Sequence, residues 1–190
     1  MNAMFSDCFS LTSLDITHFN TSKVTDLSSL FSRCSSLTSI DVSHLDTKNS
    51  EYLSSIFHSC ISLTSIDVST FDFGNCMTTF QMFYNCTKVK NINIQKVKSE
   101  KLTSLSGMFS YCTSLTSLDL TGFDTTSVNQ MGNMFAYSGL KFIDLSSFDT
   151  RNCRTFTQMF QNCDGLEIRI NQQKCINLIY LLPSYVTIID

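Results

Sequence analysis

The residues with the clearest capacity for chemistry in this 190-residue chain are its nine cysteines. A cysteine can act as a nucleophile, a metal ligand, half of a disulfide or a small buried side chain. Two of them, Cys76 and Cys153, stand where other copies of a recurring motif have valine. Six others share one place of that motif: Cys8, Cys34, Cys60, Cys86, Cys112 and Cys163. Because a residue that exchanges with valine behaves as a small hydrophobic residue, we expect buried, reduced thiols that serve packing.

Three other roles for the cysteines stay open. Disulfides between neighbouring repeats would need a demanding geometry, and zinc prefers clustered ligands, whereas these cysteines lie one per repeat. Catalysis would need a partner base, but the three histidines, His18, His44 and His58, fall at turn or outward places, and no Cys-x-x-Cys occurs. We therefore expect no catalytic residue, no metal site and no cofactor.

A row of carboxylates forms the second chemically capable set. Its members alternate with apolar residues: Asp15, Asp41, Asp67, Asp119 and Asp144. Asn93 interrupts the row and Arg169 ends it. We expect these side chains to hydrogen-bond with serines along a solvated strand, and binding of calcium or of a cationic partner is the alternative.

Deviations from this regular row are more informative about recognition, because a specific partner needs differences between repeats. The fourth copy places Asn91, Asn93 and Gln95 outward, and the sixth places Phe142 on the same face. An exposed phenyl ring beside polar amides can anchor a partner. Drift within one copy, with Phe142 making a contact near the end of the repeats, is the alternative interpretation.

The whole chain is organised by one repeat. Its seven copies start at Met-Phe-like pairs near residues 4, 30, 56, 82, 108, 134 and 159, spaced by 26 residues and finally by 25. A constant period of this length indicates stacked coils with one repeat per turn. We expect a single domain over 1–190, with 171–190 as a cap-like terminal segment that includes Pro183.

Each copy changes its hydrophobic period along its length. Segments such as Leu118 to Leu120 alternate apolar and polar residues, which predicts a short strand in every copy. Segments such as Val24, Leu27, Leu30 and Phe31 follow a spacing of three, which predicts a short helix held by its neighbours. The expected fold is an α/β solenoid, a right-handed coil with one parallel sheet and the helices on the opposite side.

The repeat unit also resembles a known family. The string "MFSYCTSLTSLDLTGFDTTSVNQM" is similar to the repeat of BspA-like leucine-rich repeat surface proteins of bacteria and protists, a class also seen in mycoplasmal surface lipoproteins, over residues 4 to about 170. The resemblance implies a surface-displayed adhesion or host-binding repeat without catalytic residues. The chain departs from commoner leucine-rich repeats in lacking an asparagine ladder after the strand, where residues such as Phe19 and Phe123 stand.

The composition of the chain excludes some classes of binding partner. The chain is 43% hydrophobic and 15% charged, with a net charge of −3, so it lacks the basic surface that nucleic acid or an anionic membrane requires. The late apolar stretch 176–189 is too short to span a bilayer. We expect a monomeric, non-enzymatic interaction module that binds a protein or glycan surface through its concave strand face, and a structural spacer or intracellular scaffold segment is the alternative.

The location of the protein follows mainly from the resemblance, which implies the cell surface or the exterior. The first residues carry no signal peptide and begin within a motif copy, so we expect a fragment of a longer protein. Nine cysteines without evident pairing indicate either the alternative, a reducing cytoplasm, or thiols too buried to react.

Overall fold

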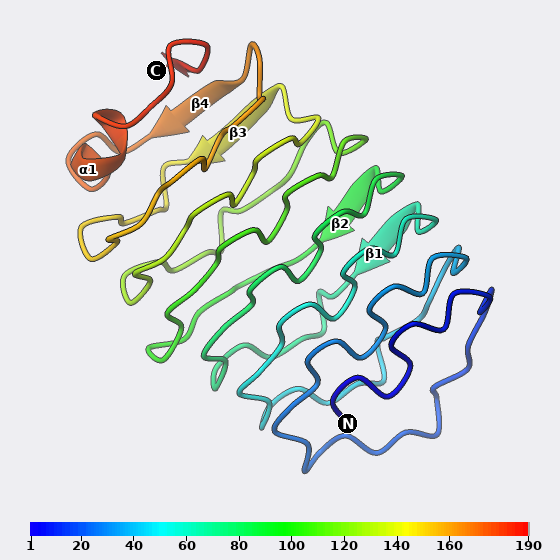
Figure 1. Ribbon diagram of the computed structural model, residues 1–190. Helices are drawn as coiled ribbons and strands as arrows, with labels where there is room; N and C mark the ends of the chain where they lie inside the picture. Colours follow the sequence, from blue (N-terminus) through cyan, green and yellow to red (C-terminus); the bar gives the residue numbers. More distant parts are fainter. Residues whose placement is uncertain (190) are drawn as a thin grey trace.

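The computed structural model describes residues 1–189 of the chain. Each copy of the repeat forms one turn of a coil, and successive coils lie side by side from the N-terminal to the C-terminal end (Figure 1). The predicted repeat fold is therefore confirmed. The handedness of the coil and the assignment of 1–190 as one domain stay predictions, and residue 190 of the predicted terminal segment lies outside the described residues.

Strand pairing is less extensive than the sequence predicts. The strands of the described residues are β1 (Ser65–Asp67), β2 (Asn91–Asn93), β3 (Phe142–Leu145), β4 (Glu167–Ile170) and β5 (Thr187–Ile189). They form two separate parallel sheets, β1-β2 and β3-β4-β5, with corresponding residues of neighbouring coils opposite each other. The prediction of one strand in every copy and one continuous sheet is wrong: segments 14–16, 40–42 and 118–120 are not strands.

The main chain also joins the coils elsewhere, along the segments that contain the Met-Phe pairs. There, every second amide donates to a carbonyl of the next coil. The amide of Leu27 donates to the carbonyl of Tyr52 at 3.0 Å, and the amide of Ser29 donates to the carbonyl of Ser54 at 2.9 Å. A chain of parallel bridges runs through the same segments at Asp26, Tyr52, Thr78, Ser104, Gln130 and Thr155. This ladder joins all seven coils, including the third and fourth, whose strands β1 and β2 also pair.

These Met-Phe segments are not helices, so the prediction of a short helix in each copy is also wrong. The intervening amides close tight turns, as Leu30 does by donating to the carbonyl of Leu27. Two residues of each turn segment have positive φ, for example Ser29 at 58° and Arg33 at 60°. A right-handed helix excludes such residues. Consecutive turns of three to four residues bury apolar side chains at a helix-like spacing, which explains why the pattern resembled a helix.

The only helix in residues 1–189 is α1 (Ile176–Ile179), in the terminal segment. It precedes β5, which pairs with β4 and adds one further strand to the second sheet. Figure 1 shows α1 and β4 at one end of the stack, with the N-terminus at the other.

A column of phenylalanine rings runs through the core from coil to coil. The rings belong to the second residue of each Met-Phe pair: Phe5, Phe31, Phe57, Phe83, Phe109, Phe135 and Phe160. Consecutive rings are stacked with centroids 5.6 to 6.0 Å apart. This separation is in the favourable range for offset stacking. The column fixes which residues of successive coils face each other.

The sixth repeat is one residue shorter than the others, and a glycine stands where it is shortened. Where the fifth copy reads "YCTSL", the sixth reads "YSGL". The amide of Gly139 donates to the carbonyl of Cys112 at 3.1 Å. A Cβ atom at this position would lie 2.3 Å from the carbonyl oxygen of Thr113, so only glycine allows the shortened coil to pack this closely.

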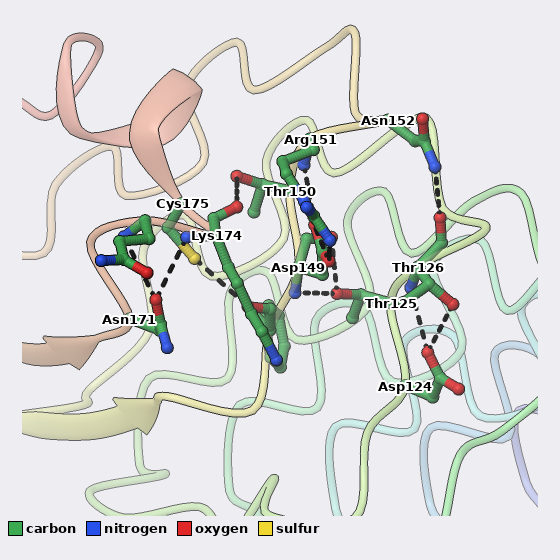
Figure 2. A network of polar contacts seen from close by, with 12 residues as sticks. Asp124, Thr125, Thr126, Asp149, Thr150, Arg151, Asn152, Asn171, Lys174 and Cys175 are labelled. Atoms are coloured by element: carbon green, nitrogen blue, oxygen red, sulfur yellow. Dashed lines mark hydrogen bonds and ion pairs between the residues drawn. The ribbon is translucent and has the colours of Figure 1, made fainter.

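Buried threonines join the turns that follow the strand segments. The hydroxyl of Thr125 donates to the carbonyl of Asp149 at 3.0 Å and accepts a hydrogen bond from its amide at 2.8 Å (Figure 2). Thr47 bonds both backbone groups of Asp72 in the same way. Thr150 continues the series by donating to the carbonyl of Lys174. These hydroxyls bond the backbone of the next coil, the task that an asparagine ladder would have performed.

We predict that Thr125→Val lowers the free energy of unfolding by about 1–3 kcal/mol, because the amide and carbonyl of Asp149 lose a buried partner. Thr125→Ser keeps the hydroxyl and is the matched control, with a much smaller loss expected. Urea unfolding followed by circular dichroism measures both. Equal losses in the two variants would show that the methyl group of Thr125, rather than its hydroxyl, holds the turn.

Candidate functional site on the strand face

The cysteines form a buried ladder rather than a reactive site. Eight of the nine are buried free thiols and Cys8 is half-buried. The ladder thiols donate to phenylalanine carbonyls of the preceding coil, as Cys60 does to Phe31 at 3.0 Å and Cys112 to Phe83 at 3.2 Å. Burial raises the pKa of Cys60 and of Cys112 to about 12. The thiols are therefore protonated and weakly nucleophilic at neutral pH, and the prediction of packing thiols is confirmed.

We predict that a thiol reagent labels only Cys8 rapidly in the native protein, because the other eight sulfur atoms lie inside the coil stack. Labelling followed by intact-mass measurement gives the number of modified residues. In guanidinium chloride all nine thiols should react, which provides the control. Rapid modification of most thiols without denaturant would contradict the buried ladder.

The acidic row performs a local structural task. Each carboxylate accepts a hydrogen bond from the amide two residues later, for example Asp41 from Ser43 and Asp67 from Ser69, both at 2.9 Å. Hydrogen bonds from the backbone amide and then the hydroxyl of Thr121 lower the pKa of Asp119. Such Asx turns reverse the chain where the strand segment ends. Within residues 1–189 no group of three or more histidines, cysteines or carboxylates is placed to hold a metal ion.

We call the surface formed by the outward side chains of β1–β4 and of the equivalent segments in the other coils the strand face. A hollow of about 600 Å³ lies on it across the fourth, fifth and sixth coils. It gathers six of the nine residues that the sequence predicted for binding: Asn91, Asn93, Gln95, Asp119, Phe142 and Asp144. Ser117 and Thr121, which sequence reasoning did not select, also line it and occupy the same outward rows.

The three remaining predicted residues lie outside this hollow. Asp41 and Asp67 line a smaller one of about 110 Å³ on the second and third coils. Asp67 is connected to the main hollow through Asn93, whose amide donates to its carboxylate at 3.0 Å. Asp15 lies in the first coil and lines neither hollow. Every carboxylate of the row therefore forms its own turn, and only Asp119 and Asp144 also line the larger hollow.

Phe142 is held in place on the strand face by a neighbouring cation. It is 39% exposed, and the guanidinium of Arg169 lies 5.6 Å from its ring centroid. Arg169 also forms an ion pair with Asp144 at 3.3 Å. Because this pair is partly exposed, its effect on stability is small, but it keeps the guanidinium beside the ring. The hollow thus combines an aromatic ring, three amide side chains and two carboxylates.

The fold defines a class: proteins built from stacked coils of about 26 residues, with a hollow on the strand face where the copies differ. The chain belongs to the family described as "Mycoplasma protein of unknown function, DUF285", whose model matches residues 1–117 and 81–179. This agrees with the mycoplasmal part of the resemblance seen in the repeat. The BspA-like and surface assignments stay predictions.

The chain is also similar to one solved structure. A leucine-rich repeat protein from Bacteroides ovatus ATCC 8483, known from its crystal structure, is similar at 16% identity, with 90% of this chain and 58% of that chain covered and a TM-score of 0.26. This chain therefore spans less than two thirds of that protein, and so low a TM-score supports no argument about fold. No curated protein sequence matches the chain. Among residues 1–189, no helix is long and apolar enough to cross a membrane.

Proposed function

We propose that the chain is a non-catalytic, leucine-rich-repeat-like interaction module that binds a protein partner as a monomer. The observation that carries this proposal is the strand-face hollow of about 600 Å³, which joins Phe142 to Asn91 and Asn93 from other coils. Exposed aromatic anchors surrounded by polar groups are typical of the residues that dominate binding energy at protein interfaces.

The electrostatics of the hollow favour a protein over other macromolecules. Asp119 and Asp144 supply negative charge, and the amides of Asn91 and Gln95 can donate or accept hydrogen bonds. A partner that inserts an apolar side chain beside Phe142 and places a lysine or arginine near Asp119 would satisfy both features. Nucleic acid is disfavoured because the same carboxylates would repel its phosphates.

A structural spacer is the second candidate function, and one observation favours it. The carboxylates of the acidic row already accept backbone hydrogen bonds in their own turns, as Asp15 does from Thr17 at 2.9 Å. A row so occupied needs no ligand to explain its presence. The two candidates differ in one respect: a spacer has no reason to keep Phe142 exposed in a hollow.

We predict that Phe142→Ala weakens binding of the fluorescently labelled chain to cultured animal cells by about tenfold or more, the usual effect of removing an aromatic anchor. Tyr52→Ala is the matched control, because Tyr52 is similarly exposed at 41% and lies outside the strand-face hollow. Binding should saturate and should disappear after protease treatment of the cells. Equal binding by both variants, or no saturable binding, would favour the spacer.

We further propose that the protein is displayed at the cell surface or outside the cell. The resemblance of the repeat to surface proteins supports this location, and burial of eight thiols would protect them in an oxidising environment. Antibody labelling of intact cells that express the protein should then match the labelling of permeabilised cells. Signal that appears only after permeabilisation would place it in the cytoplasm.

A further inference from the structure

A second hollow, of about 430 Å³, lies away from the strand face, over the Met-Phe segments of the fourth to seventh coils. We call it the turn-face hollow. Its lining contains aromatic, amide and small residues: Phe80, Gln81, Tyr84, Ser106, Gly107, Ser110, Tyr111, Gly132, Asn133, Tyr137, Gln158 and Gln161. None of these residues belongs to the acidic row or to the strand-face hollow.

The hollow arises from differences in side-chain size between equivalent positions of successive copies. In the row that contains Ser106, the neighbouring copies carry Phe80 before it and Gly132 after it. The row that contains Ser110 begins with the larger Tyr84 in the fourth copy and ends with Gln161 in the seventh. Bulky side chains therefore stand at both ends, and small ones form the floor between them.

Tyrosine rings form one wall of the hollow. Tyr111 and Tyr137 are stacked with centroids 4.4 Å apart and an interplanar angle of 7°. Tyr84 lies 5.4 Å from Tyr111 and stacks on its other side with His58 at 4.8 Å. Phe80, at 42% exposure, adds a further ring at the rim. Mutual stacking orders these rings before any ligand arrives, which lowers the entropy cost of binding.

Four amide side chains of the hollow are available to a ligand, whereas the hydroxyl of Ser110 already donates to the carbonyl of Ala136 at 3.1 Å. Across residues 1–189, the side chains of Gln81, Asn133, Gln158 and Gln161 make no hydrogen bond to another residue. Each amide offers donors and an acceptor side by side. The lining contains no lysine, arginine, aspartate or glutamate.

We propose that the turn-face hollow is a binding site for a neutral carbohydrate chain. Sugars combine a flat C–H face, which stacks on aromatic rings, with vicinal hydroxyls, which pair with amide donors and acceptors. Without cationic residues the hollow does not suit the phosphates of single-stranded nucleic acid. Its amides would be left unpaired by a purely apolar ligand.

The spacing of the coils also fits a sugar chain. Neighbouring parallel segments lie about 4.8 Å apart, which is close to the length of one ring in an extended glycan. Gln81, Asn133 and Gln158 occupy one row of the repeat, with Gly107 between the first two. The side chain of Gln81 lies over Gly107, so a chain lying along the stack would meet the amides of Gln81, Asn133 and Gln158 in turn.

The experiment titrates the purified chain with neutral hexasaccharides of β-1,4-linked glucose, β-1,4-linked N-acetylglucosamine, α-1,4-linked glucose and α-1,6-linked mannose, up to millimolar concentration. The chain has no tryptophan and six tyrosines, three of them in the turn-face hollow, so tyrosine fluorescence reports on the site. Calorimetry gives the affinity. We expect at least one hexasaccharide to bind and to change the tyrosine signal.

Variants then locate the sugar. Tyr84→Ala and Tyr137→Ala should each weaken binding about tenfold or more, since each removes a stacking surface. Ser106→Leu should do the same by filling the floor while keeping every ring and amide. Tyr52→Ala and Phe142→Ala should leave sugar binding unchanged. Circular dichroism confirms that each variant is folded.

Two results would overturn the proposal. Failure of every hexasaccharide to bind the wild-type chain would do so, as would binding that Tyr84→Ala, Tyr137→Ala and Ser106→Leu leave intact. A proline-rich peptide serves as a further probe, because such peptides also dock on aromatic rings. Peptide binding that these three variants abolish, without any sugar binding, would make the hollow a peptide site instead.

Discussion

The main-chain ladder between successive Met-Phe segments is the constraint on which the rest of the structure depends. Every second amide there, such as those of Leu27 and Ser29, bonds the next coil. A tight turn between these bonds needs positive φ, which costs about 1–2 kcal/mol for each residue other than glycine. The chain accepts this cost in coil after coil because the ladder and the stacked phenylalanine column lock the coils in register.

Because the coils are in register, a difference between two copies changes the surface at one defined place. Since equivalent residues of successive coils lie side by side, one substitution in one copy changes the surface at a defined point. Phe142 replaces a serine of the outward row and creates the edge of the strand-face hollow. Tyr84 and Gly107 change the turn face in the same manner. The fold thus supplies a uniform support, and substitutions in individual copies form the two hollows.

Part of the site could be predicted from the sequence because an alternating pattern states which side chains point outward. Asn91, Asn93, Gln95, Asp119, Phe142 and Asp144 were selected in this way, and the structure brings them to one hollow. The role of the acidic row was less predictable, because an Asx turn depends on the local backbone as well as on residue type. The turn-face hollow escaped prediction because its residues were assigned to helices.

The sequence alone determined the repeat, its length, the inward place of the cysteines and the outward rows, since each follows from periodicity and side-chain type. Only the tertiary structure decided between helix and turn in the Met-Phe segments, where positive φ falls on Ser29, Arg33 or Tyr111 and only rarely on glycine. The residue types at these positions do not predict a left-handed backbone conformation. The physical reason is that their conformation is set by hydrogen bonds to residues of the next coil, 24 or 25 positions away, and not by neighbours within the segment.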